Sequence, residues 1–378
     1  MKKLSLSVLF VCMISGTIFA QEVKEKKAGF QVNFFPPLST QGLQAAEYTN
    51  AASFSILAGV SKNITAFSLS ALGTYVVNDV GGVHIAGLGT YAGGNGNGFM
   101  LSGLLNRTAD FSGIGMSGLA NIAGEVNGFQ LGGLLNLAKG EGMRGAQLSG
   151  LANIGGAVNG FQLSGLFNQA RGEQMHGMQF SGLANVANNV NGVQLAGLIN
   201  VAKHVKGLQF AALVNIAETN DYPVGLVNII KNGEMSIGVS YNEIGSTVVA
   251  FRSGGRILYG IIGVGYNHKA EKEQFVVEGG FGAHIPISGR FRINNEIRSQ
   301  FLNDFSDRNM MHSGFSIMPA FKILPQWEVF GGPSINYMET DYLDNKSMFP
   351  SNNIWKKYTD DKLQQVYLGF SVGTHFLF

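Results

Sequence analysis

The sequence predicts an all-β protein: an up-and-down antiparallel transmembrane β-barrel of about 20 strands, built largely from tandem hairpin repeats. Three observations predict this class. A nine-residue motif recurs through the middle of the chain, ending for example at Asn121, Asn136 and Asn153. Apolar and polar residues alternate with a period of two. The chain is also poor in charge and rich in glycine, with 13% charged residues and 53 glycines.

The first 20 residues are typical of a secretory signal peptide that is cleaved after Ala20. Lys2 and Lys3 precede an apolar run that is too short for a membrane helix. A lipoprotein signal at Cys12 is the alternative, which the bulky Val11 disfavours. Cleavage would remove the one cysteine, so the exported chain would carry no thiol.

Composition then limits the classes of protein that fit. Lys and Arg number 26 against 24 acidic residues, so no basic excess indicates a nucleic-acid partner. After the signal, no apolar stretch reaches the roughly 18 residues of a membrane helix. The predicted organisation is a leader with a first strand or plug in residues 21–50, repeat strands in 51–232 and C-terminal barrel strands in 233–378. The last two regions are expected to form one continuous barrel.

Glycines at fixed positions of the repeats disfavour helix, and the alternation favours strands. Residues 160–168 read Gly-Phe-Gln-Leu-Ser-Gly-Leu-Phe-Asn, which sets Phe161 and Leu163 on one face and Gln162 and Asn168 on the other. Copies are separated by dipeptides such as Asn159-Gly160. Because Asn-Gly favours a type I′ turn, these dipeptides predict two-residue hairpins.

Two further patterns favour antiparallel hairpins over a solenoid. Uncharged turns such as Asn159-Gly160 alternate with charged turns such as residues 139–145 and 171–177, which end at Arg144-Gly145 and His176-Gly177, as expected if successive turns lie on opposite sides of a membrane. Pairing across these turns also slips by about two residues per hairpin, which resembles the stagger of a closed barrel. The alternative is a β-solenoid repeat region plus a smaller C-terminal barrel, in which identical positions would stack as ladders.

After the repeats the alternation persists. In residues 291–302, Ile293 and Ile297 share a lipid-facing side, while Arg292, Glu296 and Arg298 share a lumen-facing side. The chain ends on an aromatic-rich amphipathic strand with terminal Phe378, which resembles the assembly signal of Gram-negative outer-membrane barrels. The predicted partners are therefore outer-membrane lipid and, through this last strand, the barrel-assembly machinery.

The candidate functional residues are polar side chains predicted to line the barrel lumen. They are Gln130, Asn136, Gln147, Asn153, Gln162, Asn168, Gln179, Asn185, Arg292, Glu296 and Arg298. The amides could line a polar conduit or bind sugar hydroxyls, or they could satisfy one another across strands, which is favoured. The charges could form a selectivity ring or structural ion pairs. No catalytic motif occurs and the seven histidines lack ligand spacing, so no enzyme, cofactor or metal site is predicted.

The Gly-x-Gln-Leu-x-Gly-Leu-x-Asn copies are followed by Pro-Val-Gly-Leu-Val-Asn-Ile-Ile at residues 223–230 and Ile-Gly-Val-Ser-Tyr-Asn-Glu-Ile-Gly at 237–245. This order resembles a family of bacterial surface-repeat proteins over residues 53–337. The resemblance implies an outer-membrane or cell-surface location and no activity. The expected function is a non-enzymatic outer-membrane barrel, structural or a passive pore. The alternative is an adhesin-like surface repeat protein that binds an extracellular partner.

Overall fold

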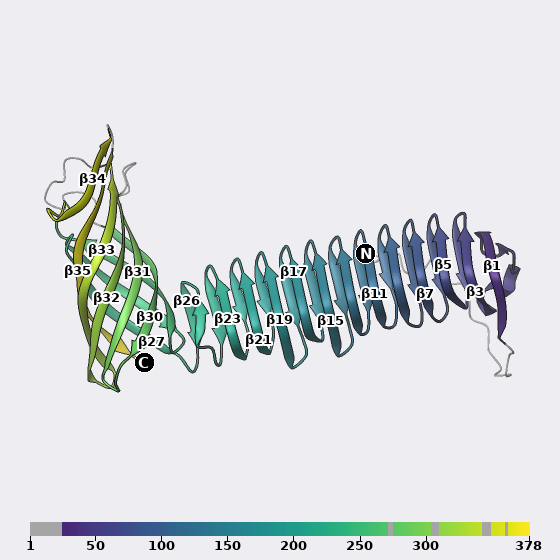
Figure 1. Ribbon diagram of the computed structural model, residues 1–378, viewed down its shortest axis with the longest axis horizontal. Helices are drawn as coiled ribbons and strands as arrows, with labels where there is room; N and C mark the ends of the chain where they lie inside the picture. The colour runs from purple at the N-terminus through teal and green to yellow at the C-terminus, as the bar shows by residue number, and fades with distance from the viewer. Residues whose placement is uncertain (1–24, 271–274, 304–309, 342–348, 360–361) are drawn as a thin grey trace, which may run out of the picture.

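A computed structural model describes residues 25–270, 275–303, 310–341, 349–359 and 362–378; the predicted signal peptide lies outside them. The chain forms two parts, a long β-solenoid of about 12 turns and a closed eight-stranded barrel (Figure 1). The prediction of one barrel of about 20 strands is therefore wrong, and the alternative of a solenoid plus a smaller barrel fits. The two parts join between β26, which ends at Ile230, and β27, which begins at Glu234.

The solenoid consists of two sheets. The 14-stranded sheet contains β1 (Lys26–Phe35), β2 (Leu38–Ser39), β3 (Tyr48–Ser55), β5 (Asn63–Ser70), β7 (Val80–Ala86), β9 (Gly96–Ser102), β11 (Phe111–Ser117), β13 (Val126–Gly132), β15 (Gly142–Ser149), β17 (Ala157–Ser164), β19 (Gln174–Ser181), β21 (Asn189–Ala196), β23 (His204–Ala211) and β25 (Tyr222–Val224). The 12-stranded sheet contains β4 (Ala58–Ser61), β6 (Gly73–Val76), β8 (Gly89–Ala92), β10 (Leu105–Arg107), β12 (Ala120–Ala123), β14 (Leu135–Ala138), β16 (Ala152–Gly155), β18 (Phe167–Ala170), β20 (Ala184–Val186), β22 (Ile199–Val201), β24 (Val214–Ala217) and β26 (Val227–Ile230). Each coil gives one strand to each sheet.

Neighbouring coils pair in parallel, with equivalent residues opposite one another. Gln162 of β17 pairs with Gln179 of β19, and Asn168 of β18 pairs with Asn185 of β20. The register does not slip, so the stagger inferred from the sequence is absent. Insertions that change the spacing from 15 to 17 residues fall in the connections between strands.

We inferred the stagger because we assigned the Asn-Gly dipeptides to turns, and this assignment is wrong. Asn159-Gly160 lies inside β17 and does not form a turn. Gly160 has φ 143°, and a Cβ there would overlap the backbone carbonyl oxygen of Gly145 in the preceding coil. Glycine is needed for this close approach of two backbones. A type I′ hairpin also requires positive φ, which explains why the sequence pattern was misleading.

The turns lie at the two long edges of the solenoid. One edge carries a leucine at the corner of every coil, and we call it the leucine edge: Leu57, Leu72, Leu88, Leu104, Leu119, Leu134, Leu151, Leu166, Leu183, Leu198, Leu213 and Leu226. The opposite edge carries charged side chains, and we call it the polar edge: Lys62, Asp79, Asp110, Glu125, Lys139, Glu141, Arg171, Glu173, Lys203 and Glu218.

The N-terminal end of the solenoid is covered by β1, β2 and a short 3-10 helix, η1 (Gly42–Glu47). Lys26 on β1 contacts Glu47 through its Nζ at 2.6 Å. Figure 1 shows this end at the far tip of the solenoid, away from the barrel. The described part of the predicted leader with a first strand or plug, residues 25–50, therefore lies outside the barrel and does not plug it.

The barrel is antiparallel. Its wall consists of β27 (Glu234–Asn242), β28 (Ser246–Gly254), β29 (Leu258–Asn267), β30 (Phe275–Pro286), β31 (Phe291–Asn303), β32 (Met310–Leu324), β33 (Trp327–Thr340) and β35 (Lys362–Leu377). Pairing of β35 with both β33 and β27 closes it. Within the described residues β34 (Asn353–Thr359) pairs with β35 alone, outside the closed wall. The up-and-down topology predicted for the whole chain thus holds only here.

The last coil of the solenoid packs against the outside of the barrel wall. The backbone N–H of Asn228 donates to Ser253 Oγ at 2.9 Å, and Asn228 Nδ2 donates to the Ser253 carbonyl at 3.0 Å. β25 and β26 contact β28 and β29. The solenoid consequently leaves the barrel sideways, with its long axis across the barrel strands (Figure 1).

Candidate functional site

The repeated asparagines form a ladder between the two sheets of the solenoid. Asn153 Nδ2 donates to Asn168 Oδ1 at 3.0 Å and to the Leu163 carbonyl at 2.7 Å, and its own Oδ1 accepts from Asn136 at 2.9 Å. The side chain is fully buried. One residue type at the same position of each coil therefore satisfies its neighbours above and below, as buried amides require.

The glutamines form a second ladder in the same core, with Nε2 of each residue donating to Oε1 of the preceding one at 2.8–2.9 Å. It runs through Gln130, Gln147, Gln162, Gln179, Gln194 and Gln209, and Asn220 donates to Gln209 at its end. The asparagine ladder runs through Asn106, Asn121, Asn136, Asn153, Asn168, Asn185, Asn200, Asn215 and Asn228.

The ladders correct the placement of eight candidate residues. Gln130, Asn136, Gln147, Asn153, Gln162, Asn168, Gln179 and Asn185 line no barrel lumen, because the repeat region is a solenoid and these side chains lie between its sheets. Their hydrogen bonds go to one another and to backbone carbonyls. The geometry matches the interpretation that the amides satisfy one another, and it leaves them closed to a ligand.

An earlier coil places a histidine at the position of the ladder glutamines. His84 is buried, and its Nε2 lies 2.9 Å from the Gly81 carbonyl, so Nε2 carries the proton. Nδ1 is buried without a hydrogen-bond partner in the described residues. Burial lowers the pKa of His84 below its ordinary value.

This burial predicts a pH dependence of solenoid stability. Because the folded-state pKa of His84 is lowered, the unfolded chain binds the proton more readily, and the free energy of unfolding falls as pH drops below about 6.5. We expect His84→Gln to flatten the dependence between pH 7 and pH 5, measured by urea denaturation. An unchanged slope in the variant would show that His84 is not the group responsible.

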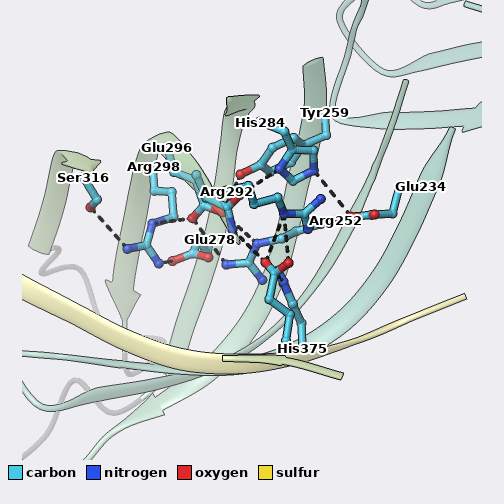
Figure 2. A network of polar contacts seen from close by, with 12 residues as sticks. Glu234, Arg252, Tyr259, Glu278, His284, Arg292, Glu296, Arg298, Ser316 and His375 are labelled. Carbon is cyan, nitrogen blue, oxygen red and sulfur yellow. Dashed lines mark hydrogen bonds and ion pairs between the residues drawn. The ribbon is translucent and has the colours of Figure 1, made fainter. Parts of the chain in front are cut away.

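The barrel interior holds a network of ion pairs (Figure 2). Glu296 Oε1 accepts from Arg252 Nε at 2.8 Å and from the Tyr259 hydroxyl at 2.9 Å. Arg298 Nε lies 3.3 Å from the other oxygen of Glu296, and Arg298 Nη1 lies 3.6 Å from Glu278. The carboxylates and guanidinium groups are nearly fully buried, so each charge is neutralised by a neighbour rather than by water.

A second cluster lies nearer the rim where the barrel begins and ends. Glu328 Oε1 accepts from Arg292 Nε at 3.1 Å and lies 2.8 Å from His375 Nε2. Arg292 also reaches Glu234 through Nη2 at 2.7 Å. Figure 2 shows Glu234, Arg292 and His375 pointing toward one another from different strands.

The sequence-predicted charges Arg292, Glu296 and Arg298 thus lie together inside the barrel. Sequence reasoning missed the partners Arg252 and His375. Each lies on the inward-facing side of its strand. In β28, Val249 and Phe251 face outward and Arg252 faces inward, and in β35, Phe376 faces outward and His375 faces inward. That alternation was a usable signal. The pairing of strands far apart in the sequence, which brings opposite charges together, was not available.

The interior is filled along its length. A small cavity lies among Asn242, Arg298, Gln300, His312 and Asn336. Apolar clusters lie on either side of the polar layers. One contains Met318, Ala320 and Phe330 toward the short turns, and the other includes Leu302, Met310, Met338 and Tyr367 toward the long loops. The charges are paired across the lumen, so they do not form a ring of one sign around an open path.

Within the described ranges, no group of three or more His, Cys, Asp or Glu side chains is arranged to hold a metal ion. The same residues include no helix long and apolar enough to cross a membrane.

Comparisons with known proteins leave the family open. No family model matches the chain. No curated protein matches it either. Among solved structures, a de novo designed transmembrane β-barrel aligns with 38% of this chain and 93% of its own, at 14% identity and a TM-score of 0.23. This likeness is too weak to carry an argument, and the discussion of function below rests on the geometry of the chain itself.

Proposed function

We propose that the protein is a non-enzymatic repeat protein of the outer membrane of a Gram-negative bacterium, in which the barrel is a membrane anchor and the solenoid is the element that makes contacts. The observation that carries the proposal is a barrel with a filled, charged interior and an apolar exterior. That distribution is the reverse of a soluble protein, and it is the one that a lipid-embedded barrel requires.

The exterior belt is continuous around the barrel. Its exposed members include Ile237, Val239, Val249, Ile262, Val264, Phe275, Val277, Phe281, Ile297, Phe301, Phe315, Ile317, Phe321, Val329, Ile335, Leu368, Phe370 and Val372. Val264 is 65% exposed and Ile297 61%, whereas the adjacent Glu296 is 1% exposed. Large exposed apolar surfaces of this kind mark contact with lipid or a partner.

A passive pore, one of the functions expected from the sequence, loses support from the same interior. Buried pairs such as Arg252–Glu296 and Arg292–Glu328 occupy the space that a solute would cross. The repeat-protein alternative fits the architecture better, since most of the chain is solenoid.

The extracellular adhesin function named in that alternative is disfavoured by the side of the membrane on which the solenoid would lie. The solenoid joins the barrel at the rim that carries the short turns 255–257, 287–290 and 325–326 and the terminal Phe378. In bacterial outer-membrane barrels short turns face the periplasm and longer loops face outward. We therefore place the solenoid on the periplasmic side of the membrane.

The anchor proposal predicts a folded barrel that does not conduct. Purified full-length protein should migrate faster on gels before heating than after, and it should sediment with outer membranes. In planar bilayers it should give no stable conductance steps, because the interior is filled by paired charges. Reproducible unitary steps from heat-modifiable protein, absent from a heat-denatured sample, would contradict the anchor and restore the pore.

A further inference from the structure

We propose that the leucine edge of the solenoid is embedded in the periplasmic leaflet of the membrane that holds the barrel, so that the solenoid lies along the bilayer instead of projecting from it. The partner of this surface is phospholipid acyl chain. The inference rests on the proposed membrane anchor and names what its solenoid contacts.

The outer surface of the solenoid is strongly amphipathic across its width. In the coil formed by β17 and β18, Phe161, Leu163 and Phe167 face outward on either side of Leu166. Leu166 is 42% exposed, and the equivalent leucines of other coils have similar exposure. Charged side chains gather on the polar edge instead. A leucine edge of twelve coils would be about 55 Å long. Soluble monomers rarely expose a contiguous apolar surface of this extent.

The backbone of the leucine edge suits a hydrocarbon environment. At the corner of this coil the N–H of Gly165 donates to Ser149, and the N–H groups of Leu166 and Phe167 both donate to the Leu151 carbonyl, at 2.9–3.2 Å. The same pattern repeats from coil to coil. In lipid every backbone polar group needs an internal partner, and ordinary surface turns lack one. These turns satisfy their N–H groups without water.

The contacts of the last coil with the barrel wall set how far each edge of the solenoid lies from the short-turn rim. The connection from β24 to β25 is the last one on the polar edge, and there the Asp221 carbonyl accepts from the N–H of Leu258, at the short-turn rim. On the leucine edge, Leu226 lies over Gly279, its Cδ2 3.8 Å from where a Cβ would be. Gly279 pairs with the lipid-facing Ile262, farther from that rim.

The polar edge therefore sits at the rim, and the leucine edge points into the level of the apolar belt. A second copy of the chain could also cover a leucine edge. Continuity with the belt favours lipid, since any bilayer around the barrel must meet the leucine edge at that depth.

Depth-dependent quenching tests this placement. Single cysteines at Leu166, Phe161 and Asn159 would carry a fluorophore in the full-length protein, reconstituted in phosphatidylcholine vesicles with brominated acyl chains. Val264→Cys on the barrel belt is the reference, and Glu173→Cys on the polar edge is the aqueous control. Each variant is first checked for heat-modifiable migration, and all five side chains point outward, so the labels should be tolerated.

We expect bromolipid to quench the label at Leu166 as strongly as at Val264, with quenching weaker at Phe161 and least at Asn159, while aqueous iodide quenches the label at Glu173. A Leu166 label open to iodide beside a lipid-quenched Val264 would overturn the leaflet contact and leave the anchor standing. Protection of Leu166 from both quenchers, with disulfide-linked dimers of Leu166→Cys, would assign the edge to a second copy. Loss of lipid quenching at Val264 would instead contradict the proposed anchor.

Discussion

Gly160→Ala is expected to destabilise the solenoid by about 3 kcal/mol or more, through positive φ and a backbone clash. The added Cβ would meet the Gly145 carbonyl oxygen, and backbone cannot move away as a flexible side chain can. Because coils contribute stability through their neighbours, the loss should spread along the stack. Chemical denaturation followed by circular dichroism measures the change in the free energy of unfolding.

Gly142→Ala is the matched control. Gly142 lies in β15 of the same sheet, does not have positive φ, and has open space where its Cβ would be. This substitution should change the unfolding free energy by less than about 0.5 kcal/mol. Equal and small effects of the two substitutions would mean that the coils are not stacked as closely as described.

Glu296→Gln is expected to cost the barrel about 3–5 kcal/mol, since it leaves buried cations without their counter-charge. Arg252 and Arg298 both contact this carboxylate, and Tyr259 donates its hydroxyl to it. The neutral amide cannot offset two guanidinium charges in a dry interior. Urea unfolding of the barrel in lipid or detergent, monitored by the loss of heat-modifiable gel migration, measures the change in the free energy of unfolding.

Glu339→Gln serves as the comparison for an accessible pair. Glu339 contacts Lys362 at 2.9 Å, but the lysine is 56% exposed, so water screens the interaction. Its loss should cost less than about 1 kcal/mol. If Glu296→Gln were as mild as Glu339→Gln, the interior would have to be open to water, and the filled-lumen account would fail.

The sequence predicted strands throughout, and in the C-terminal third it also predicted which side chains face inward. Ile297 outward and Glu296 inward follow from a period of two, which is a local property. The closure of this region as a barrel of its own was foreseen only in the alternative of a solenoid plus a smaller C-terminal barrel. Local alternation suffices where strands are antiparallel neighbours joined by their own loops.

The solenoid was mispredicted for a physical reason. A two-residue period assigns the two faces of a strand, and the amide face was placed inside as the structure has it, but the period does not say whether neighbouring strands pair in parallel or antiparallel. Gln162 and Asn168 are polar, yet stacking with identical residues satisfies them fully. The apolar face, which sequence reasoning treated as a lipid-facing barrel wall, is indeed exposed, but on a solenoid.

The prediction of the candidate site was likewise limited by missing information on how the strands are arranged. Arg292, Glu296 and Arg298 could be assigned to the lumen by parity, whereas Arg252 and His375 required knowledge of which strands face each other across it. Ion pairing over 44 to 47 residues of sequence depends on barrel closure and strand number. Those quantities are set by tertiary packing.

The central claim is that the repeats form a parallel, in-register solenoid. Asn159 and His176 are paired neighbours on adjacent coils, both exposed, whereas a hairpin barrel would put them in turns on opposite sides of a membrane. The measurement is disulfide formation in Asn159→Cys/His176→Cys, with Asn159→Cys/Asn191→Cys, two coils apart, as control. The account predicts efficient intramolecular cross-linking of the first pair and none of the second. Failure of the first pair to cross-link in folded protein would contradict it.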